Sequence, residues 1–149
     1  MAEQTSTGDS EIDLTQYAEF FAQAAVDGTP VVVGTTSPDG TPDVALKGSF
    51  MAWDKDHVAF WERARGETLA ALRANSKLVA LYRNPSRLRG QLRLYGEVVV
   101  LAEDGDLREQ VWNRTIAAEQ KADPEKKGVG VIARVDRIRL GPTVIVRQG

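Results

Sequence analysis

The sequence predicts a mainly β protein with peripheral helices (α+β), built as an antiparallel β-barrel that is either closed or split. Three observations predict this class: short β-branched runs separated by tight turns, a few segments of helical periodicity, and no glycine-rich phosphate loop after any strand. Strands that are joined by short turns pair in the antiparallel sense. The missing phosphate loop argues against a doubly wound parallel sheet.

The individual elements follow from periodicity and turn residues. Apolar residues at helical spacing predict a first helix over residues 13–26, which Asp27-Gly28 ends. The turn Ser37–Gly40 joins two strands into a hairpin, because Pro38 presets φ and Gly40 accepts a positive φ. The complete expected order is helix Asp13–Val26, strands Pro30–Thr36, Thr41–Ala52 and His57–Glu62, helix Gly66–Asn75, strands Leu78–Arg83 and Gln91–Ala102, helix Asp106–Lys121, and strands Val129–Leu140 and Thr143–Val146.

Length and composition limit the classes of function. A chain of 149 residues predicts one domain, here 13–149, after a frayed or disordered segment 1–12. Zero Cys excludes disulfides, thiolate nucleophiles and zinc fingers, and one His argues against a metal site or a catalytic triad. The net charge of −2 gives no reason to bind nucleic acid. Because the sequence also shows no signal peptide and no apolar run long enough for a membrane span, we expect a cytoplasmic protein that binds no membrane.

One loop carries the residue types that bind a phosphate. Arg63 and Arg65 follow the strand that ends at Glu62, and a helix begins near Thr68. The N-terminus of a helix presents unpaired N–H groups, and Arg binds phosphate through two parallel hydrogen bonds. These residues therefore predict an anion site, to which Thr68 adds a hydroxyl donor. A solvated loop with Thr68 as a helix cap remains the alternative.

The charges around this loop support an anionic ligand. The window Phe60–Tyr95 contains eight Arg or Lys and two Glu, a surplus of six positive charges in an acidic chain. Such a local field suits a small anion better than a long polyanion. Alternatively, Arg87, Arg89 and Arg93 are solvated charges of a loop and a strand edge.

Four segments carry a resemblance to a known family: the hairpin VVVGTTSPDGTPDVALKGSFMAWD, the strand HVAFWE, the stretch RARGETLAALRANSKLVALYRNP, and LRLYGEVVVLAEDGDLREQVW. Together they resemble the pyridoxamine 5′-phosphate oxidase-like family of flavin and deazaflavin oxidoreductases over Val31–Val146. The most specific family motif is Arg-x-Lys-x-x-Asn-Leu, which here is Arg63-Ala-Arg65-Gly-Glu-Thr68-Leu69. The resemblance implies a six-stranded antiparallel split β-barrel of the FMN-binding type.

The resemblance also implies roles for single residues. The loop with Arg63, Arg65 and Thr68 would hold the phosphate of FMN. Lys47 would lie near the pyrimidine end of the flavin and stabilise the negative charge that develops on reduction, and Ser49 would bond to the ring or to the ribityl chain. A surface lysine on a barrel strand is the alternative for Lys47.

Family members are usually homodimers with FMN in the cleft between subunits. A second set of cofactor contacts would then come from the other chain, with Arg89, Gln91 and Trp112 as candidates. For Trp112, packing in the core or at the dimer interface is the alternative.

These observations lead to three functional hypotheses. The first is an FMN-binding oxidoreductase that transfers a hydride or electrons to a small-molecule substrate, with no catalytic side chain named. The second keeps the fold but uses a deazaflavin coenzyme (F-420), whose anionic tail the arginines of 83–93 would bind. The third is a non-catalytic module for a flavin or for haem, although His57 is the only imidazole that could ligate haem iron.

Overall fold

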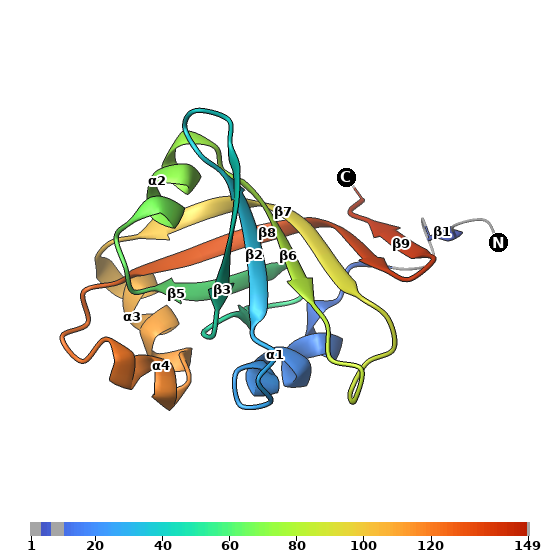
Figure 1. Ribbon diagram of the computed structural model, residues 1–149, viewed down its shortest axis with the longest axis horizontal. Helices are drawn as coiled ribbons and strands as arrows, with labels where there is room; N and C mark the ends of the chain where they lie inside the picture. Colours follow the sequence, from blue (N-terminus) through green and yellow to red (C-terminus); the bar gives the residue numbers. More distant parts are fainter. Residues whose placement is uncertain (1–3, 7–10, 149) are drawn as a thin grey trace.

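The computed structural model describes residues 4–6 and 11–148, which form one curved sheet with short helices around it (Figure 1). Within these residues the sheet has nine strands. The strands are β1 Gln4–Ser6, β2 Val31–Thr36, β3 Pro42–Lys47, β4 Met51–Ala52, β5 His57–Glu62, β6 Lys77–Tyr82, β7 Leu92–Ala102, β8 Val129–Leu140 and β9 Thr143–Val146. The helices are the 3₁₀ turn η1 Leu14–Tyr17, α1 Ala18–Ala24, α2 Glu67–Ala74, α3 Gly105–Arg114 and α4 Ala117–Ala122.

The six longer strands pair in the order β3-β2-β6-β7-β8-β5, and every one of these pairs is antiparallel. The sheet curls into a half-barrel, and β3 has a ladder with β2 alone in the described part of the chain. The predicted antiparallel split barrel is therefore confirmed. The short strands β4, β9 and β1 extend this barrel at its edges, and β1 pairs with β9 in the parallel sense.

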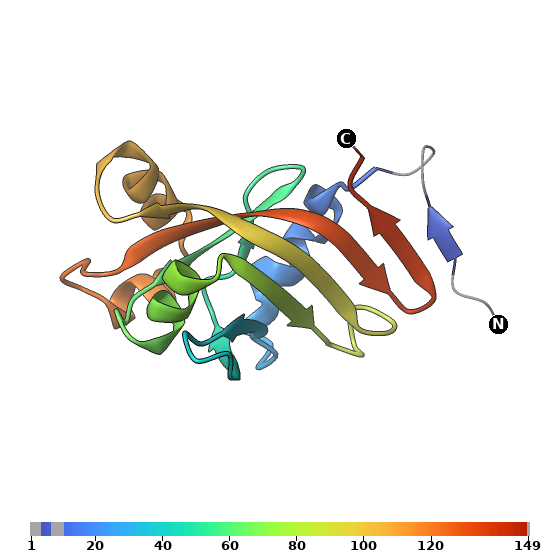
Figure 2. The same ribbon diagram turned by 90° about the horizontal axis from the view of Figure 1, so that it is seen from above.

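Alternation of side chains along the strands builds the core. On β2, Val31 and Val33 are buried while Val32 and Gly34 are only half-buried. The helices η1 and α1 lie across one end of the half-barrel (Figure 1), where the ring of Phe21 packs edge-on against Phe50 at 5.0 Å between centroids. Figure 2 shows β7 and β8 running side by side along the molecule, with α3 and α4 at one end.

Three predicted elements differ from the structure. The helix expected over 106–121 is two helices, because Thr115 and Ile116 adopt extended backbone and the Thr115 hydroxyl donates to the Val111 carbonyl at 2.7 Å. Both residues are β-branched, which lowers their helix propensity. The strand expected over 41–52 turns after Lys47, so β3 and β4 are separate. The helix expected from Asp13 starts as a 3₁₀ turn and reaches Ala24.

The N-terminal segment was expected to be frayed over 1–12. Residues 4–6 instead form β1 alongside β9, and Ile12 is buried in the core. The remaining residues of 1–10 lie outside the described part of the chain. None of the helices in the described residues is long and apolar enough to cross a membrane.

Candidate functional site

A buried ion pair lies where the barrel is split. Lys47 is the last residue of β3 and Glu62 is the last residue of β5, and the Lys47 Nζ donates to Glu62 Oε1 at 2.5 Å. The two side chains are only 10% and 6% exposed. Lys47 also donates to the hydroxyl of Thr68 in the first turn of α2, at 3.3 Å. This pair therefore connects two strands that share no ladder, and it ties α2 to the same point.

The pair opens into a cavity of about 380 Å³ between β3, β5 and the start of α4. Its charged groups are two cations, Lys47 and Arg63, and two carboxylates, Glu62 and Glu119. Glu119 packs directly over Gly48, where a Cβ would come within 2.8 Å of its carboxylate oxygen. The other lining residues are Ala25, Pro30, Leu46, Gly48, Ser49, Trp61 and Ala64. The cavity is thus electrically balanced, with polar groups set among apolar walls.

Two predicted site residues support one wall of this cavity. The Ser49 hydroxyl donates to the Trp61 carbonyl at 3.1 Å and accepts from the Trp61 N–H at 2.9 Å, which joins the turn after β3 to β5. Trp112 packs edge-on against the Trp61 ring at 4.9 Å between centroids, from outside the barrel. In this chain, Ser49 and Trp112 therefore both fix the position of Trp61.

Asp123 also holds Trp61, and the sequence analysis did not identify it. Its carboxylate accepts hydrogen bonds from Trp61 Nε1 at 2.9 Å and from the N–H groups of Lys127 and Gly128. Burial works to raise the pKa of Asp123, but the hydrogen bonds from Lys127, Trp61 and Gly128 together lower it below its ordinary value. The residue therefore stays ionised and anchors α4 beside the cavity.

The two arginines of the predicted phosphate loop diverge. Arg63 is exposed and lines the cavity, and no hydrogen bond or ion pair reaches it from the described residues. Arg65 points elsewhere, because its Nε donates to the Lys127 carbonyl at 2.8 Å and its Nη1 to Glu103 at 3.1 Å. Of the five residues predicted around the ring and the phosphate, Lys47, Ser49 and Arg63 line this cavity, Thr68 adjoins Lys47, and Arg65 lies apart.

Glu62 is the main residue of the cavity that the sequence analysis passed over. Val58, Phe60 and Glu62 alternate along β5, so they share the face of the strand that points into the barrel. A carboxylate at the end of an otherwise apolar face requires a partner. That requirement was the signal in the sequence that could have drawn attention to Glu62.

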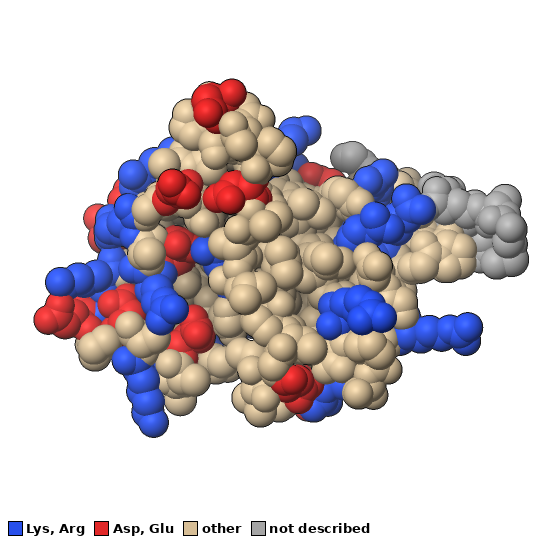
Figure 3. All heavy atoms as spheres, viewed as in Figure 1, with Lys and Arg blue, Asp and Glu red and all other residues tan. Residues whose placement is uncertain are grey.

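Arg89 and Gln91 lie in a second cavity, of about 690 Å³, at the loop between β6 and β7. This cavity shares no lining residue with the cavity at Lys47. Its lining contains three arginines and no carboxylate, and the Nε of Arg93 is buried without a hydrogen-bond partner in the described structure. Figure 3 shows basic side chains toward this side of the molecule, next to a face that is largely uncharged. The complete lining is Arg83, Pro85, Leu88, Arg89, Gly90, Gln91, Arg93 and Gly141.

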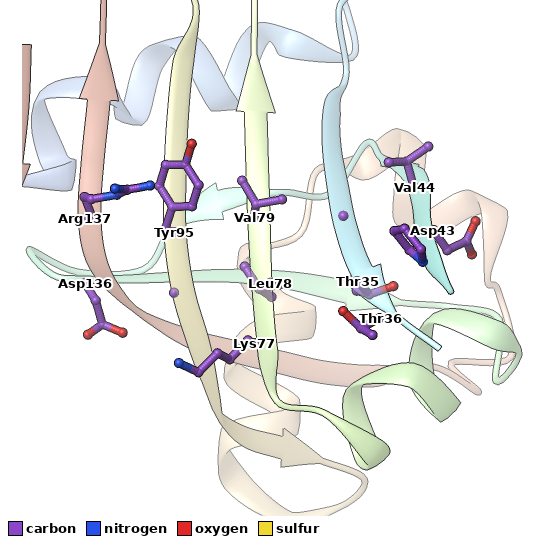
Figure 4. Close-up of a pocket in the computed structure, with 13 residues that line it drawn as sticks. Thr35, Thr36, Asp43, Val44, Lys77, Leu78, Val79, Tyr95, Asp136 and Arg137 are labelled. Atoms are coloured by element: carbon purple, nitrogen blue, oxygen red, sulfur yellow. The ribbon is translucent and has the colours of Figure 1, made fainter. Parts of the chain in front are cut away.

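The outside of the barrel contains a third cavity, of about 570 Å³, whose lining is mainly apolar but includes the charged residues Asp43, Lys77, Asp136 and Arg137 (Figure 4). Val79 of β6 and Tyr95 of β7 lie side by side on it, and the guanidinium of Arg137 lies 4.0 Å from the centre of the Tyr95 ring. On β3, Val44 and Leu46 are 69% and 64% exposed. Exposed apolar side chains gathered on one sheet face are typical of an interaction surface.

Comparisons with solved structures agree with the fold. A putative pyridoxamine 5′-phosphate oxidase from Lactobacillus delbrueckii superposes with a TM-score of 0.66 at 21% identity, covering 93% of this chain and 99% of that one. An FMN-binding protein from Syntrophomonas wolfei gives 0.62 at 14% identity, covering 85% and 89%. A protein described as an F-420 reductase gives 0.59 at 23% identity, covering 74% and 89%. At these identities the likeness shows a shared fold.

The sequence itself supplies the family. No curated protein matches the chain. The sequence profile of the pyridoxamine 5′-phosphate oxidase family, however, matches residues 16–139, which include every strand from β2 to β7, the four α-helices and nearly all of β8. The chain belongs to the pyridoxamine 5′-phosphate oxidase-like family of split barrels.

Proposed function

We propose that this protein binds FMN in the cavity at Lys47 and serves as a flavin-dependent oxidoreductase. One observation carries the proposal: the split of the barrel brings the ion pair of Lys47 and Glu62 together with Arg63 in one cavity with apolar walls. The family contains flavin-dependent oxidoreductases, and one structural relative is named as an FMN-binding protein.

The residues of the cavity fit the two ends of FMN. Pro30 and Leu46 offer apolar surface for a flat ring, and the Lys47–Glu62 pair offers polar contacts at the inner end. Arg63 is exposed at the outer end, where its guanidinium is free to bind a phosphate.

The chain's own residues then have distinct tasks. The flavin, when bound, supplies hydride or electron transfer. Lys47 donates a hydrogen bond at the edge of the ring where electron density rises on reduction, while the Glu62 carboxylate offsets its charge. Trp61, held by Ser49, Trp112 and Asp123, fixes the end of β5 that carries Glu62. Arg63 holds the phosphate. The substrate is a small molecule that would reach the exposed side of the ring.

We further propose that the working form is a homodimer. Arg89 and Gln91 lie in a different cavity from Lys47, so they reach a cofactor at Lys47 only from a second copy of the chain. The exposed Val44 and Leu46, together with Val79 and Tyr95, give the outer sheet face the apolar character of a subunit interface.

A titration with FMN tests the cofactor. The purified protein is expected to bind FMN with a micromolar or lower Kd. Binding should shift the visible absorption band of the flavin to the red or give it fine structure, and should quench the flavin fluorescence. Light scattering of the same sample is expected to give the mass of two chains. If the protein quenches FMN fluorescence no more than the same concentration of free tryptophan does, FMN does not bind and the proposal is wrong.

A deazaflavin coenzyme is the second candidate. It is favoured by the arginine-lined cavity with Arg83, Arg89 and Arg93, which suits a tail with several carboxylates, and by the relative described as an F-420 reductase. Parallel titrations with FMN and coenzyme F-420 separate the candidates. A tenfold or greater preference for F-420 that disappears in Arg89→Ala would favour the deazaflavin.

A further inference from the structure

The Lys47–Glu62 pair has unused hydrogen-bonding capacity. The carboxylate of Glu62 receives one hydrogen bond from the described residues, from Lys47, although a carboxylate has room for about four. The ammonium of Lys47 uses two of its three N–H donors, on Glu62 and Thr68. Both side chains line the cavity, so the remaining acceptor positions of Glu62 and the remaining donor of Lys47 are available to a ligand there.

The balance of charge argues against an anion at this end of the cavity. The nearly buried Lys47 already has its counter-ion in Glu62, and Glu119 adds a second negative charge to the lining. A phosphate placed beside Lys47 would either meet the Glu62 carboxylate or displace it from its ion pair, and both outcomes are unfavourable in a site with little solvent. The group that fits beside the pair is therefore neutral and polar.

We propose that the Lys47–Glu62 pair recognises the imide edge of a flavin ring, in which a carbonyl group is adjacent to an N–H group. Lys47 donates to the ring carbonyl, and Glu62 accepts from the neighbouring N3–H. This inference rests on the proposed flavin function and assigns Glu62 as the residue that selects for the N–H. It also gives the two ends of the cavity different tasks, because the buried pair binds the edge of the ring and Arg63 binds the phosphate.

Riboflavin and 3-methylriboflavin provide the test, since the methyl group replaces the N3–H and neither compound carries a phosphate. The wild-type protein is expected to bind riboflavin about 10- to 100-fold more tightly than 3-methylriboflavin, the effect of losing a hydrogen bond to a charged group. This comparison requires no variant, so it remains decisive if a substitution at Glu62 impairs folding.

The variant Glu62→Gln sharpens the test. Its amide oxygen can keep the bond to Lys47, but its NH₂ group then faces the ligand's N–H, so we expect riboflavin and FMN to lose affinity by about the same factor, 10- to 100-fold. The discrimination against the 3-methyl compound is expected to disappear. Glu109→Gln, which changes an exposed carboxylate paired with Lys126 outside the cavity, is the matched control and should keep both affinities and the discrimination.

Each other result contradicts the inference in a distinguishable way. If the wild type binds the two compounds with equal affinity, Glu62 does not recognise the N3–H. If Glu62→Gln binds FMN more tightly and riboflavin as before, Glu62 only competes with phosphate for Lys47. Uridine carries the same imide edge without the tricyclic ring. If micromolar uridine displaces riboflavin, the ligand of the Lys47–Glu62 pair is a pyrimidine nucleoside and not a flavin. Failure of both riboflavin and FMN to bind would overturn the proposed function and this inference together.

Discussion

The cavity at Lys47 and the arginine-lined cavity at the β6–β7 loop handle charge in opposite ways. At the split of the barrel, the cations Lys47 and Arg63 face the carboxylates Glu62 and Glu119. At the β6–β7 loop, the described residues place three arginines around a cavity without a carboxylate in its lining. The difference follows burial: Lys47 and Glu62 are nearly enclosed, whereas Arg83 and Arg89 are exposed to water.

Burial determines which charged side chains need a partner from the same chain. A charge removed from water requires an opposite charge and hydrogen bonds, so the chain supplies Glu62 and Thr68 to Lys47. Arginines at the surface are solvated and can remain unbalanced until an anion or a second chain reaches them. The buried end of the cavity at Lys47 is therefore suited to a neutral group, and the exposed arginines of either cavity are suited to negative charge.

The largest expected effect is on stability and comes from the buried pair. Replacing Glu62 by Ala leaves the Lys47 ammonium buried without its counter-ion, so the free energy of unfolding should fall by about 3–5 kcal/mol. Glu103→Ala, which removes the exposed partner of both Arg65 and Arg73, should cost about 0–1 kcal/mol. Urea denaturation of both variants measures the contrast. Similar losses in the two would mean that Lys47 and Glu62 are as well solvated as a surface pair.

The second expected effect is on cofactor affinity and separates the arginines of one loop. Arg63→Ala should weaken FMN binding by about 1.5–3 kcal/mol, because a charge-assisted bond to phosphate is lost, and should leave riboflavin binding unchanged. Arg65→Ala is the matched control, since its guanidinium is bonded to Glu103 and the Lys127 carbonyl and should not affect FMN. Fluorescence titrations with both ligands decide. A larger loss in Arg65→Ala would assign the phosphate to Arg65.

A smaller effect is expected at the arginine-lined cavity. Arg89→Ala should weaken FMN binding by about 1 kcal/mol if the exposed Arg89 of a second chain reaches the phosphate. Arg87→Ala alters the same loop, but Arg87 is paired with Asp27, so FMN affinity should stay the same. The loss in Arg89→Ala should shrink as salt rises from 50 to 500 mM. Equal affinities in the two variants would place this cavity outside the cofactor site.

The positions of most strands along the chain could be predicted from the sequence, because local signals mark each strand. Alternation on β2, the turn at Pro38 and Gly40, and the apolar run of β5 are each contained within a few residues. The break between α3 and α4 was missed although its cause is also local. Thr115 and Ile116 are weak helix formers, but the apolar periodicity of 106–121 continued across them.

The site was predictable only in part, because its contacts join residues that are far apart in the chain. Arg63 and Arg65 look equivalent in the sequence, and they differ because Glu103 and Lys127, far along the chain, lie within reach of Arg65 alone. Glu62 becomes part of the site through Lys47, fifteen positions earlier, once the curvature of the sheet brings β3 beside β5. The contacts of the loop arginines with their partners follow from the curvature of the half-barrel, which periodicity does not specify.

The smallest expected effect concerns the paired arginine of the outer loop and appears as a pH dependence. The hydrogen bond from Arg87 is the main cause that lowers the pKa of Asp27, with a further contribution from Asn84. A lowered folded pKa means that this stabilisation is complete above the unfolded value, near about 3.9, and is lost as the pH falls through the folded pKa. Asp27→Asn should therefore show a shallower fall of Tm below pH 4 than the wild type. Parallel curves for Asp27→Asn and the wild type would mean that Arg87 is as free as Arg89, and the contrast within this loop would be lost.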